Sequence, residues 1–289
     1  PAFDCADNIR STIQAVRDTY DTIVLSTWDN EEVRDRNWLE RNGVVIVAVP
    51  ASRLQHTHNQ DKQVVGVLAG LRAIPNIAPD DRITKTRTDI TTDIAAFTRH
   101  AQLADESHPE WRTSTDLRGM IHVPFSKHPF WVMDMFVSAR ASDFEAFWSA
   151  SDPLLHSDHR VFSSKIHAAL PANFAIRESQ RLRVSRSAAM DVVRWLSPFH
   201  SARGHLRSGS LWAFLLNNVF CCAPRSQFDG FAWRGQPWPI SNDHPRWGFL
   251  QFYEHWLALR ANPALLGHAT SWHYLQWRKI GWNPIRLAY

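Results

Sequence analysis

Residues 22–49 read TIVLSTWDNEEVRDRNWLERNGVVIVAV and carry the clearest structural signal in the chain. The runs at the two ends, Thr22–Thr27 and Val44–Val49, are rich in apolar β-branched residues, which is typical of strands. The second run is continuous, which favours a strand buried on both faces. Between them Glu31–Arg41 has a helical pattern, and Gly43 stands where a helix stop is expected. The stretch therefore predicts a β-α-β unit.

The same alternation continues on both sides of this unit. A helix capped by Asp7 is expected before it, and a helix beginning near Asn59, with an apolar stripe, after it. A strand at Arg82–Thr88 and a helix opening at Thr91 follow. This pattern predicts an α/β fold with a mostly parallel sheet flanked by helices. Ligands of such sheets bind at the carboxyl ends of the strands, where the polar residues are Ser26, Thr27, Trp28, Asp29, Thr88 and Asp89.

The rest of the chain differs in pattern. Gly119–Pro124 and Trp131–Ala139 are expected to be strands added in antiparallel fashion, followed by a helix capped by Ser142. From about Phe174 the pattern is mainly helical and rich in tryptophan. We therefore expect residues 1–150 to form the α/β part and residues 151–289 a mainly helical part of the same domain.

Composition narrows the function classes. The 289 residues are 44% hydrophobic and 21% charged, which excludes a disordered chain. No apolar run is long enough to span a bilayer. Residues 1–150 hold 16 Lys+Arg against 21 Asp+Glu, whereas residues 151–289 hold 16 against 7. The basic second half suits a phosphate, an acidic lipid or nucleic acid, although a merely basic surface has the same composition.

Several common motifs are absent from the sequence. There is no phosphate-binding loop of the P-loop type, no G-x-G-x-x-G, no G-x-S-x-G, no paired CxxC and no H-E-x-x-H. P-loop enzymes and ordinary dinucleotide enzymes are therefore disfavoured. Three cysteines do not make a disulfide framework, so a reducing cytoplasm is the expected location.

The strongest chemical motif is KTRTD at residues 85–89. Side chains alternate along a strand, so Lys85, Arg87 and Asp89 are expected to share one side. Asp89 at the strand end could hold Mg²⁺ or Mn²⁺ bridged to a diphosphate, and the two cations could neutralise phosphate charge. The alternative is an ordinary salt bridge in which Lys85 or Arg87 pairs with Asp89.

Two further patterns contribute candidate residues. Asn59 and Gln63 are spaced to present their amides together on a helix. Gly66 and Gly70 on that helix indicate close packing on the sheet or close approach of a ligand. Asp134 interrupts an apolar stretch, and a buried carboxylate is a candidate functional group unless loop amides satisfy it.

In this order and spacing, the motifs resemble the WavE-type lipopolysaccharide synthesis proteins of bacteria. They are IVLSTWD at residues 23–29, Asn59 with Gln63 ahead of Gly70-Leu71, KTRTD at 85–89, and DMF at 134–136 before Asp143. The resemblance covers roughly residues 8 to 180. It implies a glycosyltransferase with a GT-A-like, Rossmann-related fold that moves a sugar from a nucleotide-sugar donor to a surface-polysaccharide acceptor, lipopolysaccharide or capsule.

The resemblance also implies roles for residues. Ser26, Thr27, Trp28 and Asp29 would line the nucleotide, and Asn59 and Gln63 would bond its base or ribose. Lys85 and Arg87 would counter the diphosphate, and Asp89 would hold a divalent cation, Mn²⁺ or Mg²⁺, or a hydroxyl of the donor sugar. Asp134 would be the general base, with Glu178 as the second choice. Both inverting and retaining mechanisms stay open.

The chain departs from the family pattern in two places. A strand that usually precedes the first helix is not seen ahead of that helix, so the first strand of the α/β part is expected to be missing from the sequence. The usual Asp-x-Asp metal motif reads Arg87-Thr88-Asp89, with a single acid. Arg87 could therefore replace part of the charge of a cation.

Nine of the fourteen tryptophans follow residue 150, which suits either helix packing or contact with sugars and a membrane interface. The expected acceptor is a glycan or lipid-linked glycan, with peripheral contact at the inner membrane and no nucleic acid. The competing function is a non-catalytic module that binds anionic glycan or nucleic acid through the basic half. A nucleotidyltransferase is disfavoured because no glycine-rich loop follows the first strand.

Overall fold

The computed structural model describes residues 5–51, 59–109, 115–128, 131–153, 166–185, 211–212, 214–238 and 253–261. Its helices are α1 (Cys5–Val16), α2 (Arg36–Arg41), α3 (Asn59–Arg72), α4 (Ile94–Ser107), α5 (Ala141–Ser149), α6 (Ile166–Arg177), the 3-10 helix η3 (Arg225–Phe228) and α9 (Tyr253–Ala261). Its strands are β1 (Ile23–Trp28), β2 (Val44–Val49), β3 (Arg82–Lys85), β4 (Ile90–Thr91), β5 (Ile121–Val123), β6 (Ser126–His128), β7 (Trp131–Val132), β8 (Val137–Arg140), β9 (Phe220–Cys222), β10 (Ala232–Trp233) and β11 (Gln236–Pro237).

The first β-α-β unit is present, although its helix begins at Arg36 and not at Glu31 as predicted. β1 and β2 are parallel and pair from Ile23 with Val44 to Trp28 with Val49. Gly43 has a φ of 75° and ends α2, which confirms the predicted helix stop. The expectation that β2 is buried on both faces was wrong, because Val45 is 38% exposed. The chain combines helices and strands in this region, which agrees with the mixed α and β class. One face of β2 is partly open to solvent.

Helix α3 packs closely on β1. A Cβ added to Gly66 would lie 3.6 Å from Ser26 Oγ, and one added to Gly70 would lie 3.6 Å from Ser26 Cβ. Of the two interpretations of these glycines, close packing of the helix on the sheet is the one that the structure shows. Val64 and Leu68 on the same helix are buried, as the apolar stripe predicts.

The third predicted strand does not extend the parallel pair. β3 pairs antiparallel with β8, which also pairs antiparallel with β5, while β9 joins β5 in parallel. The largest sheet, β3-β8-β5-β9, is therefore mixed, and the prediction of a mostly parallel sheet was wrong. The physical reason is that β8, with Val137 and Ala139 almost fully buried, takes the place beside β3. The predicted antiparallel addition is thus central to the sheet.

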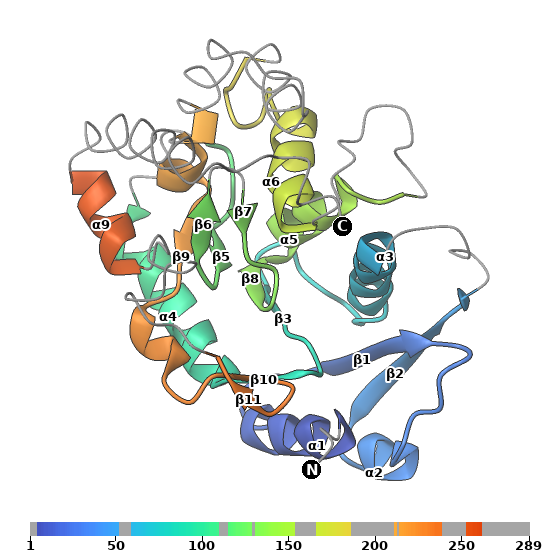
Figure 1. Cartoon of the computed structure of the whole chain (residues 1–289). Helices are drawn as coiled ribbons and strands as arrows, with labels where there is room; N and C mark the ends of the chain where they lie inside the picture. The colour runs from blue at the N-terminus through green and yellow to red at the C-terminus, as the bar shows by residue number, and fades with distance from the viewer. Residues whose placement is uncertain are drawn as a thin grey trace, which may run out of the picture.

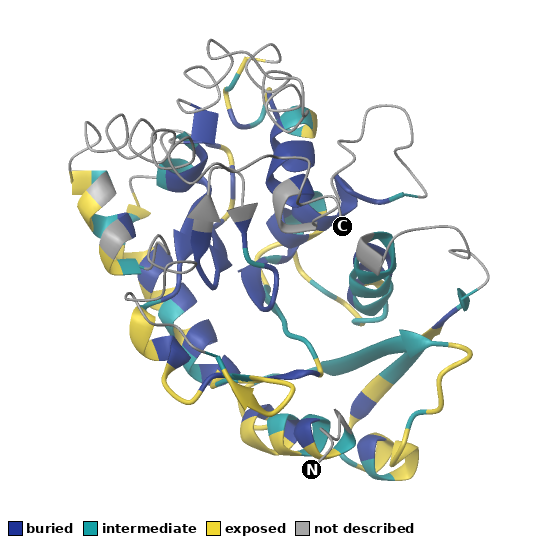
Figure 2. Ribbon diagram, viewed as in Figure 1, coloured by how far each residue is buried: buried dark blue, intermediate teal, exposed yellow. Residues whose placement is uncertain are grey.

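The edge of β1 that faces away from β2 has no partner strand among the described residues. The N–H of Asp29 donates to the Val49 carbonyl at 2.9 Å, so alternate residues of β1 direct their backbone groups toward β2. Val24 and Ser26 direct theirs to the opposite edge. All six residues of β1 are only half-buried (Figure 2). The strand expected ahead of the first helix concerns residues before Cys5, which lie outside the described residues.

The second half of the chain is less helical than expected in the part that the structure describes. α6, α9 and residues 214–218 are helical, but β9, β10 and β11 are strands. β9 is part of the largest sheet, and β10 pairs antiparallel with β4 at the lower side of Figure 1. This pairing places a hairpin from the second half beside the segment that follows the KTRTD motif.

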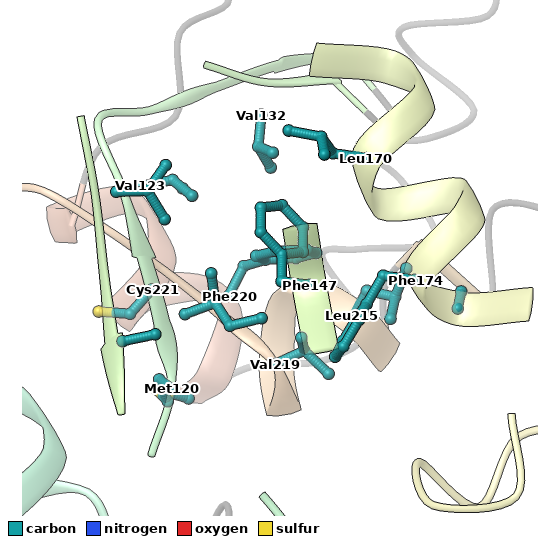
Figure 3. Close-up of a cluster of buried hydrophobic side chains, with 14 of the residues drawn as sticks. Met120, Val123, Val132, Phe147, Leu170, Phe174, Leu215, Val219, Phe220 and Cys221 are labelled. Atoms are coloured by element: carbon teal, nitrogen blue, oxygen red, sulfur yellow. The ribbon is translucent and has the colours of Figure 1, made fainter. Parts of the chain in front are cut away.

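The main core lies between the largest sheet and α5, α6 and residues 211–212 and 214–219. Figure 3 shows Phe147, Phe174 and Phe220 pointing toward one another within it. Phe147 contacts both of the other rings edge-on, with centroids 5.6 and 5.8 Å away. Phe144, Phe147 and Trp148 are at most 1% exposed, which confirms the predicted apolar face of α5. Among the described residues, no helix is long and apolar enough to cross a membrane.

We expect Gly119→Ala to destabilise the protein. A Cβ at this position would lie 2.8 Å from Asp105 Oδ2 and 2.9 Å from Arg140 Cγ. The Asp105 carboxylate is itself held by hydrogen bonds, so the free energy of unfolding should fall by about 1–3 kcal/mol in denaturant titration. Gly66→Ala is the control, because its Cβ meets only an ordinary contact in a helix. Equal stability of Gly119→Ala and the parent would contradict this account.

Candidate functional site

Asp134 lies in the connection between β7 and β8, not within a strand as the sequence suggested. It is 5% exposed. The amide of Gln63, from α3, donates to Asp134 Oδ2, and the Lys85 ammonium, from the end of β3, donates to the Asp134 backbone carbonyl. Asp134 Oδ1 accepts no hydrogen bond from the described residues. Three segments far apart in sequence thus meet at Asp134, whose carboxylate keeps one oxygen available.

Lys85 is held on a second side by an aromatic ring. Its Nζ lies 5.3 Å from the ring centroid of Trp148 on α5, a cation–π contact. Burial lowers the pKa of Lys85 to about 8, although the nearby Asp134 favours the charged form. The ammonium is therefore still mostly protonated at neutral pH and remains a hydrogen-bond donor.

Asp89 accepts hydrogen bonds on both carboxylate oxygens. Arg87 binds it in a bidentate manner, with Nε and Nη2 each 2.8 Å from an oxygen. The indole N–H of Trp233 donates to Oδ2 at 2.9 Å, and Arg234 Nε lies 3.4 Å from the same oxygen. We call Arg87, Asp89, Trp233 and Arg234 the Asp89 cluster.

The ionised form of the Asp89 carboxylate is strongly favoured. Burial alone would raise the pKa of Asp89, but hydrogen bonds and charge from Arg87 and hydrogen bonds from Trp233 and Arg234 hold it well below its usual range. The hydrogen bond to Asp89 raises the pKa of Arg87 in turn. Of the two predicted pairings, the structure shows Arg87 with Asp89, while Lys85 binds the Asp134 carbonyl.

A buried amide fixes the backbone around Asp89. Asn8 on α1 is 8% exposed, and its Nδ2 donates to the carbonyls of Thr88 and Ile90, both at 2.8 Å. Its Oδ1 accepts from the Thr91 hydroxyl at 2.7 Å. The residues on both sides of Asp89 are therefore held by the first helix.

The predicted nucleotide-binding residues Ser26, Thr27 and Trp28, at the carboxyl end of β1, and Asp29, directly after it, make no hydrogen bond or ion pair with these groups among the described residues. Ser26 Oγ is buried against α3 and has no hydrogen-bond partner among the described residues. Thr27 Oγ1 donates to Glu31 at 3.0 Å, and Asp29 Oδ1 accepts from the Ala51 N–H at 2.9 Å. Trp28 packs with Val49 and Val65. Their predicted contact with a nucleotide stays a prediction.

The two predicted amides have different outcomes. Gln63 reaches Asp134 and so joins the candidate site. Asn59 begins α3, as expected, but its side chain lies outside the described part of the structure.

Glu178, the second choice for general base, belongs to another group of charges. Its carboxylate lies 3.4 Å from Arg181 Nη1 and 3.6 Å from Arg177 Nε. Arg181 also pairs with the buried Asp143, which accepts from the Arg118 and Gly119 N–H groups. Glu178 makes no contact with Asp134 or Asp89 among the interactions of the described residues. Glu178 is therefore not part of the group of side chains around Asp134 and Asp89.

Sequence reasoning missed Asn8, Trp148, Trp233 and Arg234. The expected tryptophan roles divide in the structure: Trp212 and Trp256 are 1–2% exposed and pack in the core, while Trp233 is 39% exposed. One local signal for Arg234 exists, since Arg-Gly between two short β-like runs is a hairpin turn candidate. The other contacts join segments too far apart for a local pattern.

A divalent cation does not fit Asp89 as it stands. Both oxygens of the carboxylate already face nitrogen donors, and two of its neighbours are guanidinium groups. In the described part of the chain, no group of three His, Cys, Asp or Glu side chains is arranged to hold a metal ion. The donor set at Asp89 is therefore suited to an anion more than to a cation.

The chain was also compared with known proteins. No family model matches it, and neither the curated proteins nor the solved structures provide a match.

Proposed function

We propose that the protein is a glycosyltransferase that moves a sugar from a nucleotide-sugar donor to a bacterial surface-polysaccharide acceptor, lipopolysaccharide or capsule. The observation that carries this proposal is the convergence of Lys85, Arg87, Asp89 and Asp134. Lys85 donates to the Asp134 backbone carbonyl, and two residues along the chain Arg87 binds Asp89 in a bidentate manner. The sequence resemblance implies roles in sugar transfer for the same four residues.

The arrangement provides the two functions that sugar transfer needs. A nucleoside diphosphate leaving group must be stabilised by positive charge, and Arg87 and Lys85 provide it. An acceptor hydroxyl must lose its proton to a base within hydrogen-bond distance, and Asp134 Oδ1 is the oxygen left available for it. Gln63 holds the other oxygen and so orients the carboxylate.

The fold gives these groups a fixed framework. The α/β architecture and the parallel β1–β2 unit with α3 packed on it are compatible with a GT-A-like, Rossmann-related arrangement. In this proposal the nucleotide lies near the carboxyl ends of β1 and β3, where ligands of α/β sheets bind. Ser26, Thr27, Trp28 and Asp29 would contact it from β1, and Asn59 from the start of α3.

A nucleotide screen tests the proposal. We expect one of UDP, GDP, ADP and CMP, or its sugar conjugate, to raise the melting temperature selectively, because binding to the folded state stabilises it. The matching nucleotide sugar should then release its nucleoside phosphate faster when bacterial glycan acceptors are added. Arg87→Gln should weaken the shift, whereas Arg118→Gln should not, since Arg118 pairs with Asp80 on the surface.

The competing binding module predicts a different result. In that case no nucleotide stabilises the folded protein, and anionic glycan or nucleic acid binds with an affinity that falls steeply with salt. That combination would contradict the transferase proposal. The glycan-binding arm uses the same folded sample, so a negative nucleotide screen cannot be attributed to unfolding.

A further inference from the structure

The hydrogen bonds around Asp89 use the positions that a metal would need. An ionised carboxylate offers about four lone-pair sites. Arg87 takes one site on each oxygen, and Trp233 and Arg234 share Oδ2 as well. A cation bound through Oδ2 would have to displace these donors, and one bound through Oδ1 would lie beside the positively charged Arg87 guanidinium. The carboxylate is therefore directed at the side chains of the protein itself.

The charge balance of the region is positive. Lys85, Arg87 and Arg234 face Asp89 and Asp134, and Asp89 and Arg87 both stay charged because of their pairing. A further divalent cation would add to this positive charge, whereas an anion such as a diphosphate would offset it.

Both arginines keep donors for a ligand. Arg87 uses Nε and Nη2 on Asp89, and Arg234 uses Nε, while Nη1 of Arg87 and both Nη groups of Arg234 make no hydrogen bond to the described residues. Their side chains are 35% and 66% exposed. The Asp89 carboxylate thus holds two planar guanidinium groups by one side and leaves their outer nitrogens facing solvent, a geometry that suits phosphate oxygens.

The turn of the β10–β11 hairpin holds the Arg234 side chain beside Asp89. Arg234 and Gly235 form its two-residue turn with φ values of 51° and 71°, the pattern of a type I′ turn. Arginine is an unfavourable residue at positive φ. The Arg234 N–H donates to the Asp89 carbonyl at 2.7 Å, and its guanidinium lies 5.6 Å from the Trp233 ring centroid. A strained residue held by its backbone and its side chain at once indicates a function for that side chain.

We propose that Asp89 is a positioning residue rather than a metal ligand, and that it orients Arg87 and Arg234 to bind the diphosphate of the donor without a divalent cation. The identity of the ligand as a nucleotide sugar rests on the proposed function above. The anion site itself rests only on the Asp89 cluster.

Calorimetric titration with inorganic pyrophosphate tests the site, with EDTA in one arm and Mn²⁺ in the other. We expect binding in EDTA. A hydrogen bond to a charged group contributes about 1.5–3 kcal/mol, so Arg87→Gln and Arg234→Gln should each weaken binding about 10- to 100-fold. Arg118→Gln is the matched control and should bind as the parent does. Arg87→Lys should fail to restore affinity, because lysine cannot make the bidentate contact with Asp89.

The direction in which Asp89→Asn changes the affinity for pyrophosphate distinguishes a positioning role of Asp89 from a simple effect of its charge. Asp89→Asn removes a negative charge near the anion, so electrostatics alone predicts tighter binding of pyrophosphate. The positioning role predicts weaker binding, because the amide has one acceptor oxygen instead of two and its NH2 group would face a guanidinium donor, so the bidentate contact with Arg87 is lost. Tighter binding would overturn the proposal. If Asp89→Asn does not fold, Arg87→Lys makes the same distinction, because it keeps the positive charge and loses the bidentate contact with Asp89.

The remaining outcomes distinguish this inference from the function. Binding that requires Mn²⁺ and disappears in EDTA would overturn the inference while leaving the transferase proposal intact. Metal-free binding of pyrophosphate without binding of any nucleotide sugar would support the anion site and contradict the transferase. No binding of pyrophosphate in either arm by the folded protein would overturn the inference.

Discussion

Asp134→Asn is expected to lower the turnover number for sugar transfer by about 10²- to 10⁴-fold, the usual effect of losing a general base. The affinity for the donor nucleotide should change little, because the Asp134 carboxylate is assigned to the acceptor hydroxyl. The variant should fold, since an asparagine carbonyl can still accept from Gln63, and Lys85 binds the backbone of residue 134 rather than its side chain. Steady-state kinetics with the donor found in the nucleotide screen measures both quantities.

Glu178→Gln is the matched control for this prediction. Glu178 pairs with Arg177 and Arg181, apart from Asp134, so turnover should stay within about threefold of the parent, less than 1 kcal/mol in the barrier. If Glu178→Gln abolishes turnover and Asp134→Asn does not, the assignment of the base is reversed. If neither does, the acceptor is activated by another group.

Local sequence patterns predicted structural features correctly where residues close in the sequence are also close in space. Arg87 and Asp89 are two residues apart and form the predicted pair, although the predicted strand Arg82–Thr88 ends at Lys85 and both residues lie after it. The helical period predicted the buried face of α5, and Gly43 the end of α2. Each of these depends on a few residues and on backbone geometry alone.

Contacts across the chain could not be predicted in the same way. Trp233 and Arg234 reach Asp89 from 144 and 145 residues away, through a hairpin that pairs with β4. The order of strands in the largest sheet depends on which apolar strand packs best beside β3, and β8 fills that position. The hydrophobic period does not show which strand pairs with which. The predicted parallel sheet therefore includes β3, which pairs antiparallel with β8 in the structure.

Asp105 is a buried charge whose importance for stability could not be predicted from the local sequence either. Nothing local marks this residue, which lies on α4 among polar neighbours. In the structure it is 4% exposed and accepts from three groups: the Arg82 guanidinium, the Met120 N–H at 3.1 Å and His122 Nε2 at 2.9 Å. Burial lowers the pKa of His122, so the imidazole is neutral and donates to the carboxylate.

Asp105→Asn is expected to cost about 3–5 kcal/mol of unfolding free energy, the range for breaking a buried ion pair by removing one partner. The Arg82 side chain is 5% exposed and would lose its counter-charge without access to water. Denaturant titration at neutral pH measures the loss. Asp80→Asn is the control, because the Asp80–Arg118 pair is exposed and worth about 0–1 kcal/mol.

The pH dependence of the unfolding free energy, compared between the parent and Asp105→Asn, is a second and independent test of the buried Asp105 carboxylate. Burial alone would raise the pKa of Asp105, but His122, Arg82 and the Met120 N–H lower it to about 2. A carboxyl group whose folded pKa is depressed stabilises the protein above its unfolded pKa, near 3.9, and that contribution is lost as the pH falls toward 2. The parent should therefore lose stability more steeply than Asp105→Asn between about pH 4 and pH 2. Parallel stability curves over this window would show that Asp105 is not the buried anion on which α4 and β5 depend.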